Sequence, residues 1–278
     1  MCSSISDSAR AEYIGRIQQY MTKAVHEAKT NLSWISDDPA YVESLQQFVE
    51  KILQPGNSSQ PNSFLEQMQA FIPAISFFGA INSLAQRVLM ITSPGNPDIY
   101  QGTELWDFSM VDPDNRRPVD YALRQRLLSE LDHRAEAGNL PELCADLLNT
   151  YDDGRIKMWT TMQALRLRRD KRDLFHAGRY LPLNAAGAKS KHLVAFAREH
   201  NHQVAIIAVP RLSYTLAGGA LRAPLAELWG PTELPVPPNT AEFLENVFTG
   251  EKVRVTAQRT LLCSEVFAHF PVALLINA

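Results

Sequence analysis

The sequence predicts an α/β fold followed by a β domain, and three observations carry this prediction. Apolar residues recur at helical spacing through roughly the first 170 of the 278 residues. Roughly the last 100 residues hold short apolar and β-branched runs bounded by Gly, Pro, Asn and His. The first part offers only one short strand for its helices to pack on. This pattern is expected for the last portion of a fold in which helices and strands alternate.

The first helices have clear start signals. In residues 9–28, apolar residues recur at helical spacing after Ser6 or Ser8, either of which can serve as N-cap. Asp38 and Pro39 start a second helix, for which Gly56 offers a C-terminal stop. A long apolar helix over 63–92 follows the linker 55–63, and Pro73 is expected to kink or split it.

The remaining chain divides where the hydrophobic period changes. A short strand is expected at 97–102, and helices at 121–138, 141–149 and 159–170. Five strands are expected after that, at 178–183, 192–199, 203–210, 242–250 and 270–276, with a Pro-rich loop over 230–240. We therefore predict three segments: helical residues 1–92, a mixed segment 93–172, and a C-terminal antiparallel β-sheet domain 173–278.

Composition excludes several classes of protein. A formal net charge of -3 gives no field that would attract nucleic acid or an anionic membrane. No run of about 18 uninterrupted apolar residues occurs, so we expect no membrane span. Cys2, Cys144 and Cys263 are odd in number and far apart, which is typical of reduced thiols; with no targeting signal apparent, we expect a cytoplasmic location.

The segment 98–120 concentrates more charge than a structural loop needs. It contains six acids and two arginines: Asp98, Glu104, Asp107, Asp112, Asp114, Asp120, Arg116 and Arg117. Such groups can bind the vicinal hydroxyls of a neutral polyol, while Tyr100 or Trp106 faces the C–H side of a sugar ring. In the other interpretation, Arg–Asp pairs hold the backbone of the loop itself. Composition leaves both interpretations open.

Other site signals are weak. Two of these acids could form a glycosidase pair, but spacing along the chain does not set the 5–5.5 Å separation, roughly, that a retaining enzyme needs. His192, His200 and His202 lie in the β-rich part and are expected in exposed turns, without a second ligand cluster. We therefore expect no metal and no cofactor.

Several motifs resemble a known family. TSPGNPDIYQGTE, at 92–104, resembles the eighth barrel strand of the α-amylase family of glycoside hydrolases. ELWDFSMVDPDNRRPVDY, at 104–121, is similar to the signature of the trehalose-forming subgroup of that family. Segments 16–49, 81–95 and 164–175 also resemble this subgroup. The resemblance covers nearly the whole chain, but only the C-terminal portion of the family enzyme.

The resemblance implies a fold and a reaction. The fold is the last strand and helix of a (β/α)₈ barrel, followed by the C-terminal antiparallel β domain. The reaction is a retaining intramolecular transglycosylation that converts the reducing-end α-1,4 bond of a maltooligosaccharide to α,α-1,1. The family's three catalytic acids lie on or after strands four, five and seven, and the Thr-His-Asp-Thr-Lys-like motif of the third is absent here. The resemblance therefore implies no catalytic residue in this chain, which alone is predicted to be inactive.

What it does imply is a set of substrate-binding residues. They are Tyr100, Gln101, Glu104, Trp106, Asp112, Asp114, Asn115, Arg116 and Arg117. The expected partners are a maltooligosaccharide and, through surfaces that the missing barrel would cover, a second copy of the chain. Two alternatives stay open: a non-catalytic carbohydrate-binding or accessory module, and a related α-amylase-family glycosidase.

Overall fold

The computed structural model describes residues 6–57 and 59–277, so Cys2 lies outside the described residues. These residues form two compact units. The helical unit comprises residues up to Pro73 together with Phe108–Pro118, and the sheet unit comprises Ala74–Asp107 and the chain from Val119 onward. These boundaries differ from those of the three segments predicted from the sequence.

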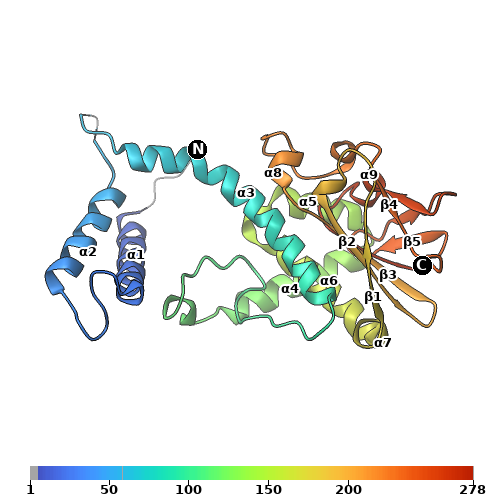
Figure 1. Ribbon diagram of the computed structural model, residues 1–278, viewed down its shortest axis with the longest axis horizontal. Helices are drawn as coiled ribbons and strands as arrows, with labels where there is room; N and C mark the ends of the chain where they lie inside the picture. The colour runs from blue at the N-terminus through green and yellow to red at the C-terminus, as the bar shows by residue number, and fades with distance from the viewer. Residues whose placement is uncertain (1–5, 58, 278) are drawn as a thin grey trace. The chain divides into compact units, whose positions relative to one another are not determined.

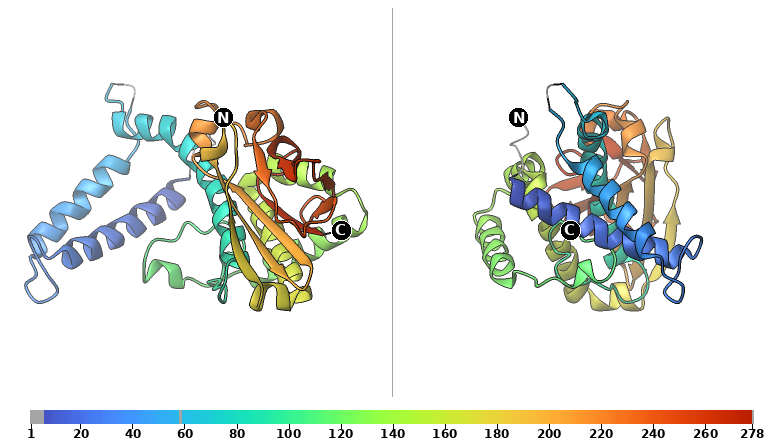
Figure 2. Two further views of the ribbon diagram at one scale, coloured as in Figure 1. Left: turned by 45° about the vertical axis from the view of Figure 1, so that its right-hand side comes forward. Right: turned by 90° about the vertical axis from the view of Figure 1, so that its left-hand side faces the viewer.

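Two antiparallel helices, α1 (Asp7–Ala28) and α2 (Pro39–Leu53), form the core of the helical unit (Figures 1 and 2). The Ser6 hydroxyl accepts a hydrogen bond from the Ala9 amide, and the Asp38 carboxylate accepts from the amides of Ala40 and Tyr41. Both predicted N-caps are therefore confirmed. α2 ends at Leu53, before Gly56, so the predicted glycine stop is wrong.

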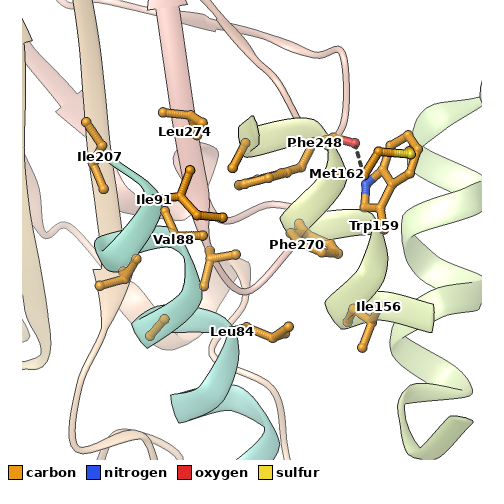
Figure 3. Packing of buried hydrophobic residues seen from close by; sticks show 14 of the residues in the cluster. Leu84, Val88, Ile91, Ile156, Trp159, Met162, Ile207, Phe248, Phe270 and Leu274 are labelled. Atoms are coloured by element: carbon orange, nitrogen blue, oxygen red, sulfur yellow. Dashed lines mark hydrogen bonds between the residues drawn. The ribbon is translucent and has the colours of Figure 1, made fainter. Parts of the chain in front are cut away.

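The long helix α3 (Ser63–Thr92) runs through Pro73 without splitting, and the boundary between the two units follows that proline. Among the described residues, α3 is the one helix long and apolar enough to cross a membrane, with a mean hydropathy of 1.4. Length and composition alone are weak evidence for a span, because core helices share them. Leu84, Val88 and Ile91 of α3 are buried in the core of the sheet unit (Figure 3).

The sheet unit is built on a six-stranded antiparallel sheet (Figure 1). In spatial order its strands are β1 (Arg179–Leu183), β2 (Leu193–His200), β3 (Gln203–Pro210), β8 (Ala273–Asn277), β5 (Phe243–Asn246) and β6 (Lys252–Arg254). A second sheet pairs β4 (Glu233–Pro235) with β7 (Thr260–Leu262). The five predicted strands are confirmed. The three others are only three residues long, too short for an alternating pattern to reveal.

The two faces of the large sheet pack against different layers. Ile207 and Leu274 face the helices, whereas the adjacent Ile206 and Leu275 face a cluster that includes Trp229 and the small sheet. Figure 3 shows Ile207 and Leu274 beside α3, with Trp159 and Phe270 in the same cluster. The helices of this layer are α3, α4 (Tyr121–Glu136), α5 (Leu140–Asn149), α6 (Arg155–Asp170) and α7 (Arg172–His176). The helices of the sheet unit and the antiparallel sheet thus share one core.

One buried cation joins the sheet to these helices. The Arg198 side chain on β2 is 1% exposed and donates to the carbonyl oxygens of Thr92, Phe175 and Gly178 at 3.1, 2.9 and 2.8 Å. Burial lowers the pKa of this guanidinium. Three carbonyls at the ends of α3 and α7 therefore depend on a single side chain.

Two sequence predictions are corrected by the fold. Residues 97–102 form no strand in the described structure, because no neighbouring strand supplies the hydrogen bonds of a ladder there. His192 is 2% exposed rather than in an exposed turn, because it lies in the short 3₁₀ helix that leads into β2.

The described residues contain no group of three or more His, Cys, Asp or Glu side chains that could hold a metal ion. Cys144 and Cys263 are buried free thiols.

Candidate functional site

The predicted substrate-binding residues fall into two groups, one in each compact unit. We call residues 100–106 of the sheet unit the site turn, and residues 108–118 of the helical unit the charged loop. The site turn holds Tyr100, Gln101, Glu104 and Trp106. The charged loop holds Asp112, Asp114, Asn115, Arg116 and Arg117.

Three cationic side chains from three helices hold the backbone of the site turn. Arg124 of α4 donates to the Gly102 carbonyl at 2.6 Å. Arg87 of α3 donates to the Thr103 carbonyl at 2.7 Å, and Lys157 of α6 donates to the Leu105 carbonyl at 3.1 Å. Charged donors form stronger hydrogen bonds than neutral ones, so these three side chains fix the backbone of a turn that has no helix or strand of its own.

The side chains of the site turn are placed by the same helices. Glu104 Oε2 accepts from Arg124 Nε at 3.0 Å. The Trp106 indole donates to the Tyr151 carbonyl at 2.6 Å, and the Lys157 ammonium lies 5.3 Å from the centre of its ring. Tyr100 is 47% exposed. The turn thus presents a paired carboxylate and two aromatic side chains, a combination that suits a sugar ring.

A pocket of about 410 Å³ lies against this turn, between α4 and α6. Its apolar wall includes Leu128, Met158 and Met162, and Glu104 and Arg124 form part of its polar edge. Ligand pockets commonly combine a mostly apolar lining with a few fixed polar groups. Glu104 therefore lies where it could contact a molecule bound in this pocket.

In the charged loop, Asp114 is the central anchor. It accepts from Arg16 of α1 through both carboxylate oxygens, at 2.9 and 2.8 Å, and from the Met110 amide at 2.7 Å. The hydrogen bond from Arg16 lowers the pKa of Asp114 to about 2. The carboxylate stays ionised at neutral pH and can accept, but not donate, a proton.

The other charges of the loop are partly used within it. Asp112 forms an ion pair with Arg116, and its carbonyl accepts from Lys23 at 2.7 Å. Arg117 donates to the Asp114 carbonyl at 3.1 Å. For these residues the structure shows ion pairs that hold the loop, the second of the two interpretations. The side chains of Arg116 and Arg117 are still 71% and 47% exposed, and Asn115 is half-buried.

Sequence reasoning missed the residues that position this set. Arg16 and Lys23 hold the charged loop, while Arg87, Arg124 and Lys157 hold the site turn. Arg16 reaches across 98 positions of the chain to Asp114, and Lys157 across 52 to Leu105. The one available signal was the excess of acids over arginines in 98–120, which indicates that partners lie elsewhere in the fold.

Comparison with protein-family models gives no match. Comparison with curated proteins gives a Mycobacterium tuberculosis protein named for maltooligosyl trehalose synthase, 30% identical over 98% of this chain. Among solved structures, maltooligosyltrehalose synthase from Arthrobacter ramosus is 35% identical over 95% of the chain, with a TM-score of 0.73. A further maltooligosyl trehalose synthase crystal structure is 28% identical over 96%, with a TM-score of 0.63.

The match is long in this chain and short in its relatives. The chain spans about 30% of the length of each of these proteins. The resemblance that the motifs around the site turn and the charged loop indicated is therefore confirmed. Over nearly all of its length, this chain is similar to one part of the maltooligosyltrehalose synthases.

Proposed function

We propose that this chain is the C-terminal portion of an enzyme that converts the reducing-end α-1,4 bond of maltooligosaccharides to an α,α-1,1 bond. The observation that carries the proposal is the match to the Arthrobacter ramosus synthase over 95% of this chain. In this role the chain supplies saccharide-binding groups and a β domain to a trehalose-forming isomerase. The reaction is a retaining transglycosylation, in which one carboxylate forms a glycosyl-enzyme and a second carboxyl group acts as acid and base.

We further propose that residues 97–102, the loop that follows them and α4 stand where the last strand, loop and helix of a (β/α)₈ barrel would stand. Residues 97–102 would become a strand only when neighbouring strands supply a ladder, which residues 6–57 and 59–277 do not provide here. Barrel enzymes carry their sites at the C-terminal ends of their strands, which is where the site turn would then lie. The hydrogen bonds from α3, α4 and α6, which fix the backbone of the turn, support this placement because a binding site needs a fixed backbone.

The chemistry of the carboxylates supports a binding role in place of a catalytic one. A general acid of a glycosidase needs a raised pKa, whereas Arg16 holds that of Asp114 at about 2. Glu104 is likewise paired with a cation, Arg124. Within the charged loop, Asp114 and the exposed Arg116 and Arg117 suit fixed hydrogen bonds to sugar hydroxyl groups, and Glu104 of the site turn suits the same role separately.

The purified chain incubated with maltopentaose is expected to give no product with an α,α-1,1 bond, because it supplies no acid–nucleophile pair. Chromatography of the products before and after treatment with a trehalose-cleaving enzyme measures this. Conversion to a trehalosyl product would overturn the predicted inactivity. Release of glucose or shorter maltooligosaccharides would favour the related glycosidase instead.

One observation favours the alternative of a non-catalytic binding module. A pocket of about 380 Å³ in the helical unit is lined by Trp34, His26, Glu43 and Gln46, among others. Trp34 is 59% exposed and stacks on His26 at 4.4 Å. An aromatic ring beside acids and amides can also hold a sugar. Saccharide bound here, and absent from the site turn and the charged loop, would select this alternative.

A further inference from the structure

The most informative unassigned group in the sheet unit is the buried amine of Lys157. The residue is 7% exposed, on the first turn of α6, and its ammonium donates to the Leu105 carbonyl at 3.1 Å. The same ammonium lies 5.3 Å from the centre of the Trp106 ring. A buried charge is stable only with such partners, so Lys157 and this part of the site turn depend on each other.

Close packing makes this contact tight. Gly154, with φ +81°, leads into α6, and a β-carbon there would lie 3.0 Å from the Trp106 amide nitrogen. The indole is also tied to the Tyr151 carbonyl at 2.6 Å. Gly154 therefore packs against the backbone of Trp106, and the Tyr151 carbonyl holds its indole nitrogen. Lys157 contacts the Leu105 carbonyl and the π system of the Trp106 ring.

We propose that Lys157 is a positioning residue of the saccharide site, whose protonated amine fixes the Leu105 carbonyl and the indole of Trp106 in the orientation that receives a sugar. The saccharide part of this proposal rests on the function proposed above. The structural part, control of Trp106 by the charge of Lys157, does not.

The surroundings of the amine lower its pKa into the mildly alkaline range. Burial, the largest cause, and the nearby charge of Arg87 on α3 both lower the pKa of Lys157, which is about 8. Glu104 and Asp107 of the chain around the site turn act in the opposite direction, and Glu104 is itself paired with Arg124 of α4. Loss of the proton leaves a neutral amine with a weaker hydrogen bond and no cation over the ring. Trp106 should therefore loosen as the pH rises through about 8.

The test is ¹⁹F NMR of the chain labelled with 5-fluorotryptophan at its four tryptophans, each of which is expected to give its own resonance. The Trp106 resonance, assigned by Trp106→Phe, is expected to shift between pH 6.5 and 9.5 with a midpoint near 8. Lys157→Met should abolish this shift, and Lys157→Arg, which keeps its charge, should hold the low-pH position throughout. Lys191→Met, at an exposed lysine of the same unit, is the matched control and should titrate like the parent chain.

Maltopentaose affinity, followed in the same samples, is expected to be about tenfold weaker at pH 9.5 than at pH 6.5. Lys157→Arg should remove this dependence. A Trp106 resonance that does not titrate, or that titrates equally in Lys157→Arg, would overturn the proposal. If Lys157→Met does not fold, the parent chain and Lys157→Arg still decide. If the titration is seen and no saccharide binds at either pH, the proposed function fails while the control of Trp106 by Lys157 stands.

Discussion

Replacing Arg198 with alanine is expected to cost about 3–5 kcal/mol of unfolding free energy in the sheet unit. The substitution removes three hydrogen bonds and leaves the carbonyls of Thr92, Phe175 and Gly178 buried without a charged donor. It also leaves a cavity on the helix-facing side of β2. Urea denaturation followed by circular dichroism measures the loss.

A matched control is Arg254→Ala on β6, whose side chain is 69% exposed and pairs with Glu242. Exposed ion pairs contribute little, so this variant should change the unfolding free energy by less than about 1 kcal/mol. Equal losses for the two variants would contradict the role assigned to Arg198. A lysine amine lacks the forked geometry with which the Arg198 guanidinium reaches three carbonyls. The loss of unfolding free energy in Arg198→Lys should therefore lie between those of Arg198→Ala and Arg254→Ala.

Asp114→Asn is expected to cost about 2 kcal/mol of unfolding free energy in the helical unit at pH 7. The pKa of Asp114 is about 2 in the folded chain, below the ordinary value of 3.8. A carboxylate with a depressed folded pKa stabilises the fold above its unfolded pKa, and the contribution is lost as the pH falls through the folded pKa. The parent chain should therefore lose this stability between about pH 4 and pH 2.

The Asp114→Asn variant lacks the carboxylate, so its unfolding free energy should change less with pH over the same interval. Trp34 is the only tryptophan of the helical unit, and its ¹⁹F resonance reports unfolding of that unit separately. Asp152→Asn, at an exposed acid of the sheet unit, serves as the control. An unchanged slope between pH 4 and pH 2 in Asp114→Asn would show that the Arg16 pair does not anchor the charged loop.

Local signals in the sequence predicted much of the fold. Helix starts were predictable because they depend on adjacent residues. The side-chain oxygens of Ser6 and Asp38 accept hydrogen bonds from nearby amides, and the fixed φ of Pro39 suits the first helical position. The long strands β2 and β3 carry runs with enough apolar residues to be recognised. The prediction of a strand at 97–102 is wrong for the described residues, because none of their strands lies beside this segment to supply a ladder.

The sequence predicts a set of saccharide-binding residues, which stays a prediction, but it gives no indication of how the fold holds them. The motifs around Tyr100 and Asp112–Arg117 pointed to saccharide binding. They could not indicate that the two groups lie in different compact units, or that Arg16 and Lys157 hold them. Arg198 stands in an apolar strand whose pattern carries no sign that its charge is buried. Such contacts join residues dozens of positions apart, and residue type alone does not specify them.

The most direct test of the central claim, that the site turn and the charged loop receive a maltooligosaccharide, is an NMR titration of the ¹⁵N-labelled chain with millimolar maltopentaose. Cellopentaose, which has β-1,4 bonds, is the matched control ligand. We predict amide shifts in residues 100–106 and 108–118 that saturate with maltopentaose and are weaker with cellopentaose. Unchanged amides in both segments, or shifts confined to the residues around Trp34, would contradict it.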